Sequence, residues 1–131
     1  VRIDAEVLIR HMSIPVVESF SALAPFGNGN PKPLFAGRHF NIRQARIIGR
    51  NKNVLKCTIS DIEKNVCDAL YFGDVEGFIN TIEMQYGTEE KDKMLRGAQN
   101  NTDVALAFNA EINEYNGIKS VQFIIQNYCI L

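Results

Sequence analysis

The residues best suited to chemistry in this sequence are basic, and they gather in its first half. Residues 1–60 hold nine Lys and Arg against three Asp and Glu, a balance of +6, whereas residues 61–131 hold five bases against twelve acids, a balance of −7. No carboxylate lies between Glu18 and Asp61. Such segregation favours a contact surface for a polyanion. The alternative is that the two halves mix in the folded molecule and their fields cancel.

Catalytic chemistry within this chain has little support from its residue types. His11 and His39 are the only histidines, and neither has a nearby pattern of cysteines or carboxylates for a metal site or a triad. Asp61, Glu63 and Asp68 could be pictured as a metal cluster, but they flank a predicted turn, where acids are common. We therefore expect no catalytic residue and no metal in this chain.

The basic residues must be positioned by strands that follow an N-terminal lead-in. Apolar residues at helical spacing predict a helix that Pro15 opens and that ends at Ala24-Pro25. Residues 25–33, rich in Gly, Asn and Pro, predict a rigid loop. Its backbone N–H groups could hold a phosphate, and the alternative is a stiff hinge between the helix and the rest. We assign residues 1–33 to this lead-in helix and linker.

Residues 34–131 carry the pattern of a small barrel. Strands are predicted from Leu34 to Gly49, over 54–60 and over 66–72, then a helix capped by Asp74. A polar piece over 88–99 is expected to add a short exposed helix, and two long strands follow, joined at Asn116-Gly117, the strongest hairpin signal present. Three strands, a helix and two strands is the order of an OB-fold, which binds oligonucleotides or oligosaccharides. We predict a mainly β protein, a five-stranded OB-fold barrel with a helix between strands three and four.

Five basic residues fall on the first two predicted strands and their turn, and we take them as nucleic-acid-binding candidates: Arg43, Arg46, Arg50, Lys52 and Lys56. Proteins that bind single strands combine a cationic groove with platforms for the bases. Lys56 alternates with two apolar neighbours, so it should point outward. Tyr71 and Tyr115 are the candidate platforms, and ordinary packing is the alternative for each.

Chain length, cysteine spacing and hydropathy indicate the number of domains, the cellular location and the absence of a membrane span. The 131 residues fit one domain, and because the chain begins with Val1 rather than Met we interpret it as a fragment of a longer protein. Cys57, Cys67 and Cys129 lack CxxC spacing, which favours free, buried thiols and a cytoplasmic location. No apolar stretch is long enough for a transmembrane helix, so we expect no membrane partner.

One long motif resembles a known family. Residues 23–35, with Pro25, Phe26, Gly27, Gly29, Asn30 and Pro31 at their centre, are similar to the signature that opens the OB domain of RecJ-type single-strand-specific DNA exonucleases. Shorter matches lie before and after this motif, in the family's order: Ile3 to Glu6, Gly49, Leu55-Lys56, Phe72-Gly73, Phe108 to Gly117 and Val121-Gln122. Many relatives carry His where this chain has Val54, so a DNA contact by that His is absent here.

The resemblance implies a role in a larger enzyme. RecJ-type exonucleases degrade single-stranded DNA from its 5′ end in recombination and repair, with manganese or magnesium held by separate DHH-type catalytic domains. The OB domain would help to close the channel that admits a single strand. The implied partners are single-stranded DNA, the parent chain's catalytic domains and a single-strand-binding protein. The alternative is a docking module that positions the catalytic core without touching DNA.

Overall fold

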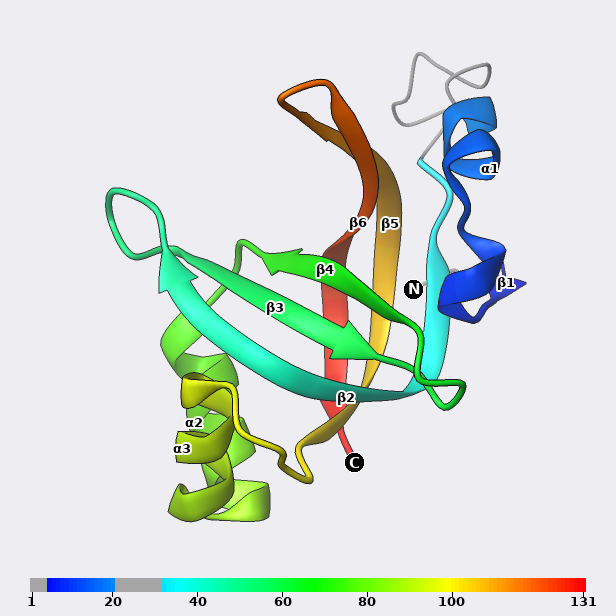
Figure 1. Cartoon of the computed structure of the whole chain (residues 1–131). Coiled ribbons are helices and arrows are strands. Elements are labelled where there is room, and N and C mark those ends of the chain that lie inside the picture. The colour runs from blue at the N-terminus through cyan, green and yellow to red at the C-terminus, as the bar shows by residue number, and fades with distance from the viewer. Residues whose placement is uncertain (1–4, 21–31) are drawn as a thin grey trace.

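A computed structural model describes residues 5–20 and 32–131 of the chain (Figure 1). Its elements, in chain order, are β1 (Ala5–Glu6), the 3₁₀ turn η1 (Ile9–His11), α1 (Ile14–Ser19), β2 (Phe35–Ile48), β3 (Val54–Ser60), β4 (Val66–Tyr71), α2 (Val75–Tyr86), α3 (Thr88–Arg96), β5 (Asp103–Tyr115) and β6 (Ile118–Ile130). The predicted end of the first helix at Ala24-Pro25 and the motif over 25–31 lie outside the described residues.

Five of the strands close into a barrel. β3 pairs antiparallel with β2 and β4, β4 pairs parallel with β6, and β5 pairs antiparallel with both β6 and β2. Within the barrel, α2 and α3 lie between β4 and β5, and this is the order and pairing of an OB-fold, so the predicted fold is confirmed. Two details go beyond the prediction: β1 adds a short parallel pairing to β2, and α2 is followed at once by α3.

The barrel closes because β2 changes partners along its length. Its first half, from Phe35 to Asn41, pairs with β5, and its second half, from Asn41 to Ile48, pairs with β3. A bulge interrupts each ladder, and bulges bend a strand and increase its twist. Gly37 lies in the bend, where an added Cβ would come within 2.4 Å of the Phe40 ring. The absence of a side chain at position 37 therefore lets the Phe40 ring turn into the core.

The two predicted hairpins form as expected. Gly49 and Lys52 take positive φ values of 93° and 54°, and the Lys52 N–H donates to the Gly49 carbonyl at 3.1 Å. Asn116 and Gly117 have φ values of 52° and 77°, as a type I′ turn requires. These turns fix the registers of β2 on β3 and of β5 on β6.

Aromatic rings fill the barrel. Phe108 and Phe123 stack with centroids 3.9 Å apart, and Phe40 meets both rings edge-on. α2 covers one end of the barrel and buries Phe78 and Ile82, while α3 packs against β2 (Figure 1). The Asp74 carboxylate caps α2 by accepting from the Gly77 N–H at 3.0 Å, as predicted.

Two smaller expectations need correction. Cys57 is buried and Cys67 is half-buried, but Cys129 is exposed, because it alternates on β6 with the half-buried Tyr128 and Ile130. α3 was expected to be an exposed helix, yet Met94 on it is fully buried. None of the helices in the described parts of the chain is both long enough and apolar enough to cross a membrane.

Candidate nucleic-acid interface

Strand register sets a row of side chains on the outside of the barrel. Arg46 on β2 lies opposite Lys56 on β3, Lys56 opposite Leu70 on β4, and Leu70 opposite Ile124 on β6. Successive residues of a strand point to opposite faces. Their neighbours Ala45, Leu55, Cys57, Ala69 and Phe123 are at most 1% exposed and point inward, so these four point outward. We call Arg46, Lys56, Leu70 and Ile124 the outer row.

The outer row has a charged end and an apolar end. Arg46 is exposed, and Lys56, Leu70 and Ile124 are half-buried. Two like charges directly opposite each other destabilise a sheet, so the Arg46–Lys56 pair does not serve folding. The outer row therefore places two cations beside aliphatic side chains on the outside of the sheet.

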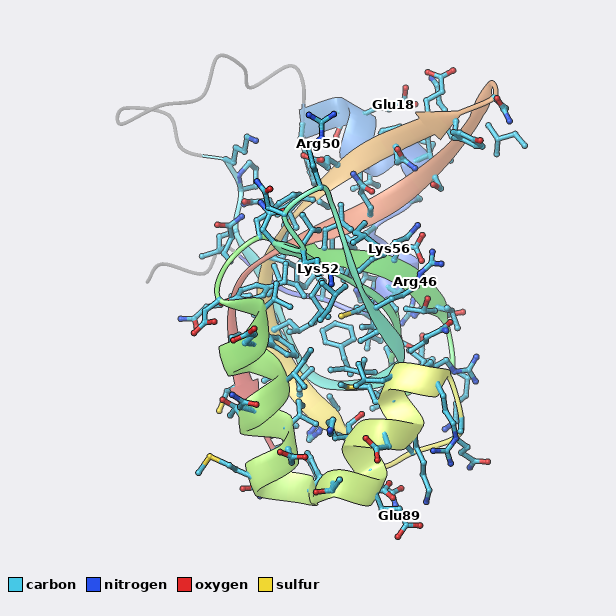
Figure 2. The ribbon with its side chains drawn as sticks, turned by 90° about the vertical axis from the view of Figure 1, so that its left-hand side faces the viewer. Glu18, Arg46, Arg50, Lys52, Lys56 and Glu89 are labelled. Carbon is cyan, nitrogen blue, oxygen red and sulfur yellow. The ribbon has the colours of Figure 1, made fainter. Side chains whose placement is uncertain are left out.

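The other predicted cations extend the charged end in both directions. Arg50 and Lys52 are exposed in the turn between β2 and β3, and Arg43 is exposed at the bulge of β2 opposite β3. Figure 2 shows Arg46, Arg50, Lys52 and Lys56 on β2, β3 and their turn, well away from Glu89 on α3. The structure therefore brings the five predicted basic residues onto one pair of strands.

None of these five cations forms an ion pair within residues 5–20 and 32–131. Three other lysines, Lys91, Lys93 and Lys119, are paired. Lys91 lies 3.2 Å from both Asp92 and Glu83, which raise its pKa, and Lys119 lies 3.0 Å from Glu18. The late acids thus pair mainly with late lysines, and the five predicted cations have no ion-pair partner in the described chain.

Carboxylates do lie on the same outer surface, in the next row. There Gln44, Thr58, Asp68, Gln122 and Glu111 follow one another across β2, β3, β4, β6 and β5. The Gln122 side chain donates to Glu111 at 3.1 Å. The negative charges of this row lie on β4 and β5, beyond the β2–β3 pair that carries the cations.

The two predicted stacking residues lie in different environments. Tyr71 pairs with the inward-facing Leu55, and its ring packs against Phe78 and Tyr128 with centroids 5.3 and 5.5 Å away. It therefore does not share a face with Lys56. Tyr115, at the end of β5, is 74% exposed opposite an equally exposed Ile118. Only Tyr115 of the two offers an open ring face.

The acids that could be pictured as a metal cluster have structural partners. The Asp61 carboxylate accepts from the backbone N–H groups of Ile9, Glu63 and Asn65 at 3.0–3.1 Å, and Glu63 pairs with Arg10. Asp61 thereby ties the lead-in to the β3–β4 turn. In the described part of the chain, no three His, Cys, Asp or Glu residues gather to hold a metal ion.

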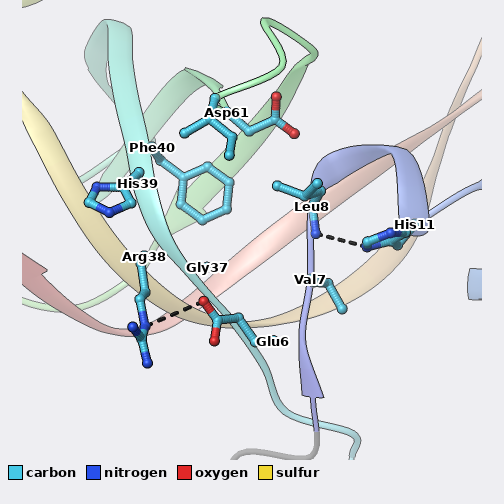
Figure 3. A pocket seen from close by; sticks show the side chains of 10 residues that line it. Glu6, Val7, Leu8, His11, Gly37, Arg38, His39, Phe40 and Asp61 are labelled. Atoms are coloured by element: carbon cyan, nitrogen blue, oxygen red, sulfur yellow. Dashed lines mark hydrogen bonds and ion pairs between the residues drawn. The ribbon is translucent and has the colours of Figure 1, made fainter.

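The buried thiols and the two histidines have separate structural settings. Burial raises the pKa of Cys57 and of Cys67 to about 12, so neither is a thiolate near neutral pH. A pocket of about 320 Å³ lies between the lead-in and β2 (Figure 3). There His11 accepts from the Leu8 N–H at 3.0 Å, and Figure 3 shows His39 on the other side of the Phe40 ring.

Sequence reasoning missed a larger polar pocket of about 690 Å³ between the linker after α3 and the β2–β3 pair. It is lined by Arg43 and by several side-chain amides, Gln44, Gln99 and Asn101 among them. The amide-rich run over 99–101 was the available signal. It could not be recognised as part of a site because the other walls come from residues about forty to sixty positions earlier.

Comparisons with known proteins agree with the topology. Residues 3–127 match the family model of the RecJ OB domain. The chain is 30% identical over 123 residues to the single-stranded-DNA-specific exonuclease RecJ of Haemophilus influenzae, an alignment that covers 93% of this chain and 18% of that protein. The chain thus spans less than a fifth of that relative's length.

Among solved structures, one similar chain belongs to a replication protein A heterotrimer bound to single-stranded DNA. The sequence identity is 10% and the TM-score 0.48, over 97% of this chain and 36% of the other. That score is too low to support an inference, so the assignment of the barrel rests on its own strand pairings.

Proposed function

Because this chain belongs to the RecJ OB domain family, we propose that it binds single-stranded DNA on the outer face of β2, β3 and β4, as a non-catalytic part of a single-strand-specific exonuclease. One observation carries the proposal. Five cations without ion-pair partners in the described chain gather on one strand pair, next to the aliphatic end of the outer row.

The proposed path of the DNA strand follows the five cations. Phosphates run along Arg43, Arg46, Arg50, Lys52 and Lys56, and bases lie toward Leu70 and Ile124. Tyr115, on the neighbouring hairpin, adds a stacking face, whereas Tyr71 supports β4 from inside the barrel. Contacts to the backbone position a strand without reading its sequence, so this path predicts little base preference and a steep salt dependence.

The role within the larger enzyme follows from the family. The relative named above is an exonuclease specific for single-stranded DNA, and this chain matches less than a fifth of it. We propose that hydrolysis, with manganese or magnesium, belongs to catalytic domains outside this chain and proceeds 5′ to 3′ in recombination and repair. The OB domain holds the single strand where it enters those domains.

Charge reversal tests the path. Fluorescence anisotropy with a labelled dT₂₀ strand in 50 mM salt should show Arg46→Glu/Lys56→Glu binding at least about tenfold more weakly than wild type, because two phosphate contacts become repulsive. Arg38→Glu/Arg96→Glu is the matched control, since it changes the net charge equally at two other exposed sites. Its affinity should stay much closer to that of wild type.

Two results would contradict the proposal. Equal weakening by both double variants would show a response to net charge alone and would remove the path. No DNA binding by wild type, together with binding to the separately expressed catalytic domains, would favour the docking module instead.

A further inference from the structure

The polar pocket between the linker after α3 and the β2–β3 pair is joined to the proposed DNA path. Gln44 lies opposite Thr58, and this rung of the ladder is the next outward-facing one after Arg46 and Lys56. Two residues along a strand span about 6.6 Å. A strand bound at the outer row therefore reaches the pocket without leaving the surface of the barrel.

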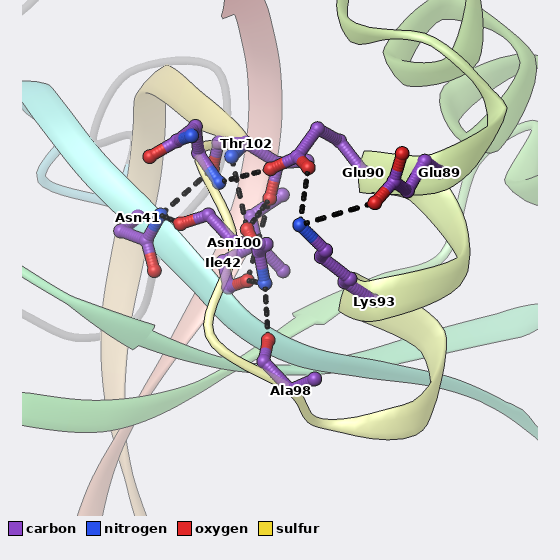
Figure 4. A network of polar contacts seen from close by, with 9 residues as sticks. Asn41, Ile42, Glu89, Glu90, Lys93, Ala98, Asn100 and Thr102 are labelled. Carbon is purple, nitrogen blue, oxygen red and sulfur yellow. Dashed lines mark hydrogen bonds and ion pairs between the residues drawn. The ribbon is translucent and has the colours of Figure 1, made fainter.

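The wall of the pocket is fixed before any ligand arrives (Figure 4). The Asn100 amide donates to the carbonyls of Ile42 and Ala98, each at 3.0 Å, and its oxygen accepts from Thr102. The Asn41 amide donates to the Asn100 carbonyl and to the Asp103 carboxylate, each at 3.0 Å. These bonds hold the linker after α3 against β2, so binding there orders little additional chain.

The rim of the pocket carries polar groups that the fold does not use. Gln44, Gln99 and Asn101 are exposed, and their side-chain amides form no hydrogen bond within the described residues. Arg43 and Lys64, also exposed, bring two positive charges to the same rim. Asn and Gln amides match the donor and acceptor edges of bases, and the two cations match a phosphate.

From this arrangement we infer that the pocket receives one nucleotide of the bound strand. Arg43 and Lys64 hold its phosphate, and the amides of Gln44, Gln99 and Asn101 hydrogen-bond its base. The inference rests on the proposed function and adds to it a single position of base preference in an otherwise sequence-tolerant contact.

Competition with unlabelled homopolymers tests this assignment. Unlabelled dA₂₀, dC₂₀ and dT₂₀ displace a labelled strand from the 131-residue chain, and the ratios of their affinities are the quantity of interest. In Gln44→Ala/Gln99→Ala/Asn101→Ala, these ratios should change by about threefold or more, because each amide–base hydrogen bond is worth roughly two- to tenfold in affinity. Asn80→Ala/Gln85→Ala, on exposed amides of α2, should keep the wild-type ratios.

The outcomes distinguish the nucleotide pocket from the DNA path along the outer row. Unchanged ratios in the triple variant, with Arg46→Glu/Lys56→Glu still defective, would overturn the pocket and leave the DNA path in place. No binding by wild type would overturn both. Altered ratios in the triple variant alone, with a further loss of affinity in Arg43→Gln/Lys64→Gln, would support the nucleotide pocket.

Discussion

Two polar regions of this small barrel differ in whether their polar side chains have partners within the described chain. Around Asn100, polar groups from β2, β5 and the linker after α3 are hydrogen-bonded to one another, and in the described chain no buried side-chain nitrogen or oxygen lacks a partner. In the outer row, Arg46 and Lys56 lie opposite each other, and neither forms an ion pair with a carboxylate of the described residues. The first region stabilises the fold, whereas the second leaves its charges available to a ligand.

Removing the centre of the bonded region should have the largest effect. Asn100 is 7% exposed and its side chain bonds to three other residues, so Asn100→Ala leaves buried carbonyl and N–H groups without partners. We expect a loss of about 3 kcal/mol in the free energy of unfolding, measured by urea denaturation. Asn80→Ala on the exposed surface of α2 should cost much less, and equal losses would contradict the distinction between the regions.

The inner side of β3 offers a second measurement, because Cys57 points into the barrel next to the outward-facing Lys56. Burial raises the pKa of Cys57 to about 12 from an ordinary value of 9, so the folded state disfavours the thiolate. The protonated Cys57 thiol contributes fully to stability below pH 9, and this contribution is lost as the pH rises from 9 toward 12. At pH 10 the loss from this thiol is about 1 kcal/mol.

Denaturation in urea at pH 8 and pH 10, for wild type and for Cys57→Ala, checks this expectation. The variant should lose less stability than wild type between the two pH values. A pH dependence identical in the two proteins would show that Cys57 does not titrate with unfolding.

The smallest expected effect is a change in the free energy of unfolding whose sign differs between an unpaired lysine, Lys56, and a paired one, Lys91. Lys56→Thr removes a like-charge pair across the sheet and introduces a residue that strands favour, so it should raise the free energy of unfolding by about 0.5 kcal/mol. Lys91→Thr removes the contacts of Lys91 with Glu83 and Asp92 and should lower stability instead. A destabilised Lys56→Thr would show that Lys56 serves the fold.

Some elements could be predicted because the residues that cause them are close together in the sequence. The Asn116-Gly117 turn, the Asp74 cap and the alternation of buried residues along β3 each depend on residues close together in the sequence. The strand order then selected the OB-fold from few alternatives. The pairing of β1 with β2 was not predictable, because a two-residue strand has no pattern of its own.

The candidate site was predictable in part for the same reason. The outward direction of Lys56 follows from its buried neighbours, and the clustering of cations follows from their position on one hairpin. The packing of Tyr71 against Phe78 and Tyr128 involves α2 and β6, which no local pattern connects to β4. The polar pocket was missed because its walls come from three separate segments.

The amino-acid sequence alone determined where the strands and turns lie and which side of β3 faces the core. It also determined that most basic residues precede most acidic residues along the chain. Only the tertiary structure decided which charges remain unpaired, because ion pairs form between residues far apart in sequence, such as Lys119 and Glu18. It also decided that Leu70 and Ile124 continue the row that Arg46 and Lys56 begin, since the closure of the barrel sets the register between β4 and β6.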